Sequence, residues 1–235
     1  MAQLNGSEIL AKALKREGVD ELFFLMGGPM LAAEAATINE GIRCIDVRHE
    51  QAAAMMAQAY SRLQQRPGVC MAASGPATIN LSTGLANALI DCCPVVALGG
   101  AGPVSGYGRQ VFQEIDQMEI MSGCVKYAAR VHDARRIPEM LNVAMQRAMS
   151  GKPGPVYLDL PGDVLYQMVD EDKIDWSPSE RPILGARPPA PQAQIDELAA
   201  ALAKAERPVL LSGSGVIWSQ AWEELHALVD ATGIP

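Results

Sequence analysis

The feature that most constrains this chain is a regular alternation of short apolar runs with amphipathic segments along residues 5–160. Short aliphatic runs are typical of buried strands, whereas apolar residues spaced three or four apart are typical of helices. We expect strands at 21–25, 43–47, 68–73, 95–99, 125–131 and 156–160, and helices at 5–18, 31–39, 50–63, 80–91, 117–121 and 137–150. Strands that alternate with helices predict an α/β domain, a doubly wound six-stranded parallel sheet with helices on both faces.

This domain is predicted to occupy residues 1–169. Prolines among charged residues then predict an extended linker at 170–191. A helix at 193–205, a strand at 208–212 and a helix at 222–232 predict the start of a second α/β domain at 192–235. One helix-strand-helix unit is too small for a normal core, so we expect either a longer natural protein or a partner chain that supplies the rest.

Composition excludes some classes of partner. The net charge of -8 and the pI of about 4.9, without a Lys/Arg block longer than two, argue against nucleic-acid and anionic membrane surfaces. The five cysteines show no zinc-site spacing, and we expect no metal ligands in this chain. The sequence lacks a signal-peptide pattern and an 18-residue apolar span, so a cytoplasmic location is expected.

A carboxylate lies where the strand predicted at 43–47 becomes a helix, in the run Arg48-His49-Glu50-Gln51. Open α/β sheets hold ligands at the carboxyl ends of their strands. An acidic residue in the first helical turn also interacts favourably with the helix dipole, by a few tenths to about 1 kcal/mol. Glu50 alone therefore fits both a site residue and a helix-stabilising one.

Three further segments lie next to predicted strands: two follow a strand, and the third leads into one. Ser74-Gly75-Pro76-Ala77-Thr78-Ile79-Asn80 can form a tight turn with free N–H groups, Phe112-Gln113-Glu114 lies in a loop, and a Gly/Pro turn at 151–155 precedes a buried strand. Taken singly, the first is also explained as a capped turn, the second as a solvated loop and the third as a structural element.

Together, these four segments resemble the pyrimidine-binding domain of thiamine-diphosphate enzymes of the acetolactate synthase, oxalyl-CoA decarboxylase and 2-hydroxyacyl-CoA lyase group. The resemblance covers essentially the whole chain. It implies that Glu50 hydrogen-bonds N1′ of the cofactor's aminopyrimidine ring and so promotes removal of the thiazolium C2 proton. This chemistry needs a carboxyl group shielded from water. The resemblance also implies that Gly75, Pro76 and Asn80 shape the cofactor pocket and that Gln113 reaches toward cofactor or substrate.

The sequence departs from the group at two positions. Ala77 replaces the second glycine of a common Gly-Pro-Gly turn, and Met26-Gly27-Gly28-Pro29 stands where many relatives carry Gly-x-Pro-Gly. We therefore assign no substrate contact to the Met26-Gly27-Gly28-Pro29 segment. For His49, a packing role and a catalytic role both stay open. No clean dinucleotide fingerprint is present. FAD is conceivable for this group but has no support in the chain.

The resemblance implies cleavage or formation of a carbon-carbon bond. Asp116-Gln117 favours a 2-hydroxyacyl-CoA lyase, and acetolactate synthase-type condensation of 2-oxo acids is the alternative. The chain lacks the Gly-Asp-Gly and Asn-Asn segments that hold diphosphate and Mg²⁺ in this group. Mg²⁺ ligands are thus expected outside this chain, and activity is not expected from these residues alone. A non-catalytic binding or assembly module is a third interpretation. A homodimer or homotetramer is implied, with helix 50–63 as a candidate contact.

Overall fold

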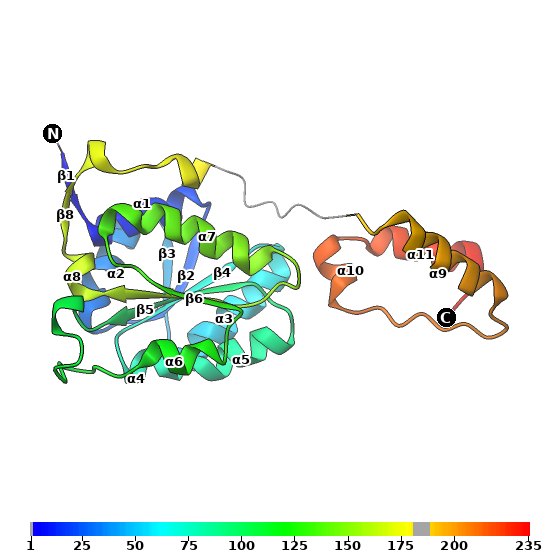
Figure 1. Cartoon of the computed structure of the whole chain (residues 1–235), viewed down its shortest axis with the longest axis horizontal. Helices are drawn as coiled ribbons and strands as arrows, with labels where there is room; N and C mark the ends of the chain where they lie inside the picture. The colour runs from blue at the N-terminus through cyan, green and yellow to red at the C-terminus, as the bar shows by residue number, and fades with distance from the viewer. Residues whose placement is uncertain (1, 181–188) are drawn as a thin grey trace. The chain divides into compact units, whose positions relative to one another are not determined.

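A computed structural model describes residues 2–180 and 189–235 (Figure 1). The chain forms two compact units, residues 1–184 and 185–235, which are described separately. The predicted boundaries at 169 and 191 stay a prediction.

The first unit contains the predicted parallel sheet. Its six strands lie in the order β3-β2-β4-β5-β7-β6. They are β2 (Glu21–Leu25), β3 (Arg43–Asp46), β4 (Gly68–Ala72), β5 (Val95–Ala101), β6 (Tyr127–Arg130) and β7 (Val156–Pro161). Every residue of β4, β5 and β7 is buried, as is usual for a parallel sheet covered on both faces. The predicted fold class is confirmed.

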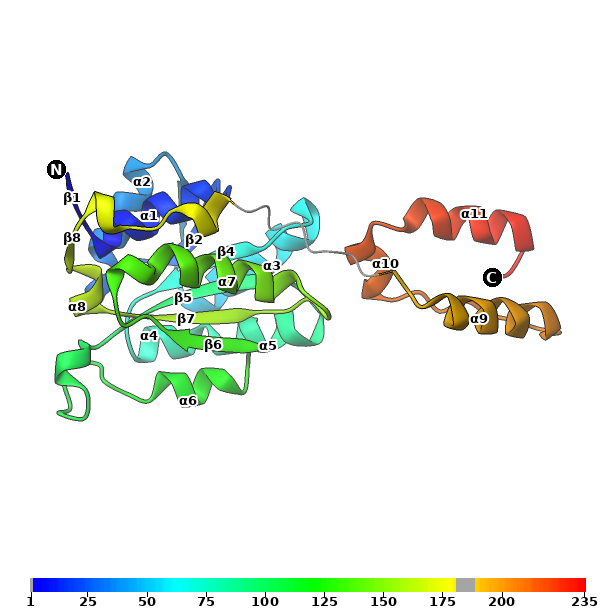
Figure 2. The same cartoon turned by 45° about the horizontal axis from the view of Figure 1, so that its top comes forward.

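Helices cover both faces of the sheet (Figures 1 and 2). One face carries α1 (Gly6–Arg16), α2 (Leu31–Asn39) and α7 (Ile137–Met149), and the other carries α3 (Glu50–Gln64), α4 (Pro76–Asn80), α5 (Ser82–Ile90) and α6 (Gln117–Ser122). Asn5 and Glu8 form the predicted capping box at the start of α1. The apolar stripe that follows, including Ile9, Leu10 and Leu14, is fully buried. Amphipathic patterning thus fixes which side of each helix faces the sheet.

The strand order contains a topological switch. The chain moves from β2 to β3 on one side and then crosses to β4 on the other side of β2. Connections therefore leave the carboxyl ends of β2 and β4 in opposite directions, which opens a crevice suited to ligands. The loops after β2, β3, β4 and β5 meet at this edge of the sheet, where the predicted site residues lie.

Several details differ from the sequence-based expectation. The helix expected at 80–91 begins earlier, as α4 followed by α5, because Pro76 fits the first turn of a helix. A small antiparallel sheet of β1 (Gln3–Asn5) and β8 (Met168–Asp170) was not predicted, and α8 (Gly162–Leu165) connects to it. These strands are three residues long and far apart in sequence, so no local pattern reveals them.

The first part of the predicted linker packs on the first unit. Ile174 is 7% exposed within the core, and the ring of Trp176 stacks under the Arg16 guanidinium at 4.5 Å. Residues 181–188 of the predicted linker lie outside the described residues.

The second unit contains α9 (Gln192–Lys204), α10 (Ser214–Ser219) and α11 (Trp222–Thr232). The prediction of a strand at 208–212 was wrong, because this segment is irregular and Leu211 is 99% exposed. A strand needs a neighbour for its backbone groups, and among the described residues the segment 208–212 makes one backbone hydrogen bond, from the Leu210 N–H to Pro235 O at 2.9 Å.

No helix in the described ranges is both long and apolar enough to cross a membrane.

Candidate functional site

Glu50 is the first residue of α3, and its side chain is enclosed. His49 caps the helix, because its Nδ1 accepts a hydrogen bond from the Gln51 N–H at 3.2 Å. Glu50 is only 7% exposed, and Asn80 Nδ2 donates to its Oε2 at 2.9 Å. The fold thus brings together two predicted site residues that lie 30 positions apart. His49 has a clear capping role.

Gly75 forms the turn after β4 in a conformation that requires glycine. Its φ is 59° and its ψ is -117°, and a Cβ there would lie 2.3 Å from Gln113 O. Pro76 follows in the first turn of α4 with an exposed ring. Gln113 itself has a φ of 60°, and its Oε1 accepts a hydrogen bond from Ser74 Oγ at 2.7 Å. Three predicted cofactor residues are therefore packed around one turn.

The loop after β2 lies beside the same turn. A Cβ on Gly27 would come within 3.1 Å of Ala73 Cβ, and one on Gly28 would come within 3.5 Å of Ser74 Oγ and 3.7 Å of Gln113 Oε1. The glycines allow two backbone segments from neighbouring strands to approach closely. This loop therefore forms one wall of the crevice at the topological switch.

A buried polar network supports the turn from below. Gln117 is 2% exposed, and its Oε1 accepts the Gly75 N–H at 2.9 Å. Its Nε2 lies within hydrogen-bond distance of Gly100 O and Tyr157 Oη, both at 2.8 Å, and of Asp159 Oδ1 at 2.5 Å. One side chain thus ties the turn after β4 to strands β5 and β7.

Asp159 is the charged centre of this network and has no exposed surface. Tyr157 donates its hydroxyl hydrogen to Asp159 Oδ1 at 2.6 Å, and Arg130 Nε donates to Oδ2. Burial, together with the Asp159 charge, raises the pKa of Tyr157 well above its usual value, so the phenol stays a donor. The Arg130 guanidinium lies 5.1 Å from the Tyr107 ring centroid. These pairings offset the free-energy cost of burying the Asp159 carboxylate.

Sequence reasoning missed the role of this network. Asp159 and Tyr157 belong to a segment interpreted as purely structural, and Gln117 was used only to choose between branches of the group. One signal was available: an aspartate in the middle of a buried apolar strand is rarely left unpaired.

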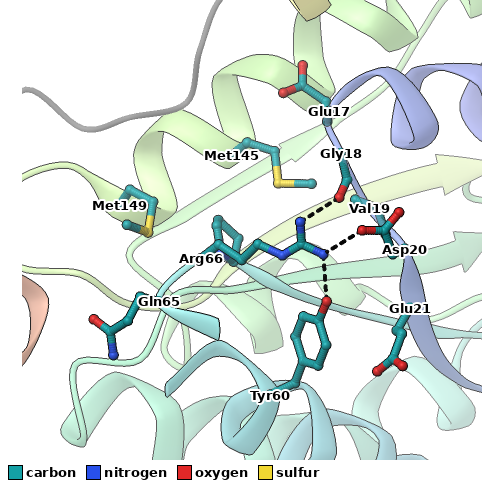
Figure 3. Close-up of a pocket in the computed structure, with 11 residues that line it drawn as sticks. Glu17, Gly18, Val19, Asp20, Glu21, Tyr60, Gln65, Arg66, Met145 and Met149 are labelled. Atoms are coloured by element: carbon teal, nitrogen blue, oxygen red, sulfur yellow. Dashed lines mark hydrogen bonds and ion pairs between the residues drawn. The ribbon is translucent and has the colours of Figure 1, made fainter. Parts of the chain in front are cut away.

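A cavity of about 230 Å³ lies at the opposite edge of the sheet (Figure 3). Arg66 spans it and donates to Gly18 O at 2.8 Å, to Asp20 Oδ2 at 3.1 Å and to Tyr60 Oη at 2.6 Å. The thioethers of Met145 and Met149 line another side. The guanidinium of Arg66 hydrogen-bonds the groups around it. The residues that line this cavity differ from those of the crevice, and none of them is a predicted site residue.

The donor set of the crevice suits an organic heterocycle better than a metal ion. Across residues 2–180 and 189–235, no three His, Cys, Asp or Glu side chains gather into a possible metal site. The crevice instead offers a buried carboxyl group at Glu50 and a glycine turn at Gly75 that packs closely against the Gln113 backbone. A carboxyl group fixed in this way can share a proton with a ring nitrogen.

Comparison with known proteins gives matches along both units. The family model described as "Thiamine pyrophosphate enzyme, N-terminal TPP binding domain" matches residues 4–120, and the model of the central domain of the same enzymes matches residues 195–235. A 2-hydroxyacyl-CoA lyase of Arabidopsis thaliana is 36% identical over 99% of this chain and 41% of its own length.

Two other relatives are named as synthases. A probable acetolactate synthase large subunit of Methanococcus aeolicus is 40% identical over 99% of this chain and 39% of its own length. The acetolactate synthase isozyme 2 large subunit of Escherichia coli is 36% identical over 99% of this chain and 41% of its own length. The chain thus spans about two fifths of the length of these three relatives.

Proposed function

The chain belongs to the thiamine pyrophosphate enzymes, and we propose that it supplies the half of a thiamine diphosphate site that activates the aminopyrimidine ring. Pyrophosphate and diphosphate name the same group. The observation that carries the proposal is the enclosed Glu50 carboxyl, held by Asn80 at the carboxyl edge of the sheet. The catalytic role of Glu50 is inferred from the family and from this geometry.

The residues around Glu50 fit this task. The Asn80 amide holds Oε2, which leaves Oε1 to share a proton with a ring nitrogen. Gly75 and Pro76 shape the adjacent wall, and Gln113 presents its amide to the same crevice. When bound, thiamine diphosphate supplies a thiazolium ring that accepts the electron pair of a breaking carbon-carbon bond. Enclosure of Glu50 excludes water from the group that exchanges the proton.

The diphosphate and Mg²⁺ are assigned to residues outside this chain segment. Mg²⁺ prefers carboxylate, carbonyl and phosphate oxygens in an octahedral shell. We propose that the complete site forms in a homodimer or homotetramer, as the family resemblance implies. On α3, Met55 and Met56 are 39% and 37% exposed and provide an apolar contact surface. The five cysteines are free, which supports a reducing, cytoplasmic location.

For the reaction we propose cleavage of a 2-hydroxyacyl-CoA. Its support is the resemblance of the Asp116-Gln117 pair to the 2-hydroxyacyl-CoA lyase branch and the 2-hydroxyacyl-CoA lyase among the relatives. Acetolactate synthase-type condensation of 2-oxo acids is the second candidate, supported by the synthases among the relatives. A non-catalytic binding or assembly module is the alternative from another class.

The test is a substrate comparison with the full-length enzyme, thiamine diphosphate and Mg²⁺. We expect cleavage of a 2-hydroxyacyl-CoA at a kcat/KM at least tenfold above that for pyruvate consumption. Faster pyruvate consumption would establish the synthase reading instead. Absence of both reactions, together with absence of thiamine diphosphate binding, would support the non-catalytic module.

A further inference from the structure

Glu34 is a buried acid that the chemistry above does not use. It lies on α2 and is 3% exposed. Its Oε1 is buried and has no hydrogen-bond partner among the described residues. A buried polar atom without a partner costs free energy, and more so when it carries charge. Such an atom in an otherwise well-packed fold calls for an explanation.

The carboxyl group of Glu34 contacts the crevice loop. The Gly27 backbone N–H interacts with it and favours its ionised form, and Gly27 and Gly28 pack against the Ser74 turn and Gln113. The contact therefore runs from α2 to the loop and from the loop to the turn that carries the proposed cofactor residues.

The charges around Glu34 disfavour its ionised form. On β3, Asp46 adds like-charge repulsion, and the neighbouring Cys44 thiol offers no positive charge. On α1, the Lys12 ammonium pairs with Glu40 at 3.3 Å. Arg48 pairs with Asp46 at the surface.

Burial is the main cause of the resulting shift. It raises the pKa of Glu34 from 4.5 to about 7, with a further rise from Asp46, while the Gly27 hydrogen bond opposes it. The net direction is upward, so the cost of burying the charge exceeds the gain from the Gly27 bond. Around neutral pH the carboxyl group therefore changes between a neutral form that tolerates burial and an ionised form that favours hydration.

We propose that Glu34 is a proton-controlled positioning residue: neutral, it holds the Gly27–Pro29 loop against the cofactor turn, and ionised, it promotes local opening of that loop. The proposal deepens the function assigned to the crevice and rests on it. Opening that hydrates the carboxyl group becomes more favourable with pH between 4.5 and 7, by up to about tenfold per pH unit, and levels off above 7.

Hydrogen exchange of the full-length enzyme, measured by mass spectrometry from pH 5 to 9, tests this proposal. The ratio of exchange in wild type to that in Glu34→Gln, taken for the peptide that contains Gly27–Pro29, cancels the chemical pH dependence of exchange. We expect the ratio to rise by at least tenfold between pH 5 and 7 and to be constant above 7. Glu40→Gln, a change at the C-cap of the same helix, should follow the wild type.

A ratio that is constant across this range would overturn the proposal. Asp46→Asn provides a second readout should Glu34→Gln not fold, because loss of the nearby charge should move the midpoint to lower pH, and an unchanged midpoint would count against us. Added thiamine diphosphate separates the two ideas. Protection at Glu50 without protection of the loop overturns the positioning role, whereas protection at neither place contradicts the proposed function.

Discussion

Replacing Gln117 by leucine should destabilise the fold through one buried network. The change leaves the Gly75 N–H without a buried partner, which costs about 1–3 kcal/mol, and removes a bond to the charged Asp159, worth about 1.5–3 kcal/mol. Asp159 keeps its bonds from Tyr157 and Arg130. The buried leucine offsets part of this cost by roughly 1–2 kcal/mol. We therefore expect a net loss of about 3 kcal/mol, within a range of roughly 0.5–5 kcal/mol.

Urea unfolding followed by circular dichroism measures this loss. The matched control is Gln64→Leu, the same substitution at an exposed helical position, which should change the free energy of unfolding by less than about 0.5 kcal/mol. A Gln117→Leu variant as stable as the control would refute the view that this network supports the cofactor turn.

Two further predictions concern the turn and the buried acid. Gly75→Ala should weaken thiamine diphosphate binding at least tenfold in calorimetry, because the added Cβ would lie 2.3 Å from Gln113 O. The control is Gly151→Ala, which should bind normally because Gly151 has a similar φ of 60° and nothing lies within 4 Å of the added Cβ. Equal affinities of the two variants would contradict this prediction. The Glu34 carboxyl ionises near pH 4.5 in the unfolded chain and near pH 7 in the folded one. Its contribution to the free energy of unfolding is therefore fully present below pH 4.5 and is lost as pH rises to 7, by roughly 3 kcal/mol in total. Glu34→Gln should lack this part of the pH dependence in urea unfolding, and identical pH profiles would disprove it.

Local patterns in the sequence were enough to predict the sheet and its helices. Apolar periodicity acts over a few residues, so it located β4 and α3 closely, and the capping box located the start of α1. The strand at 208–212 failed for the complementary reason. Its residues have strand character, but a strand forms only with neighbours for its backbone groups, and the described part of the second unit supplies one bond.

The candidate site was predictable only where the family pattern named its residues. Glu50, Gly75 and Gln113 stand in recognisable segments, and the fold places them at one edge of the sheet. The bonds that hold them depend on residues such as Gln117, which is 42 positions from Gly75. Glu34 was missed because burial of an acid on a helix is a tertiary property that no periodicity reveals.

The most direct test of the central claim is the rate of thiazolium C2 proton exchange in full-length enzyme that carries Glu50→Gln. Glutamine keeps the shape of the side chain and can still contact Asn80, but it cannot share a proton with the aminopyrimidine ring. We predict normal folding, retained thiamine diphosphate binding and an exchange rate at least a hundredfold below the wild type, since a positioned acid-base group contributes about 10²–10⁴-fold. An exchange rate equal to the wild type would contradict the assignment of Glu50.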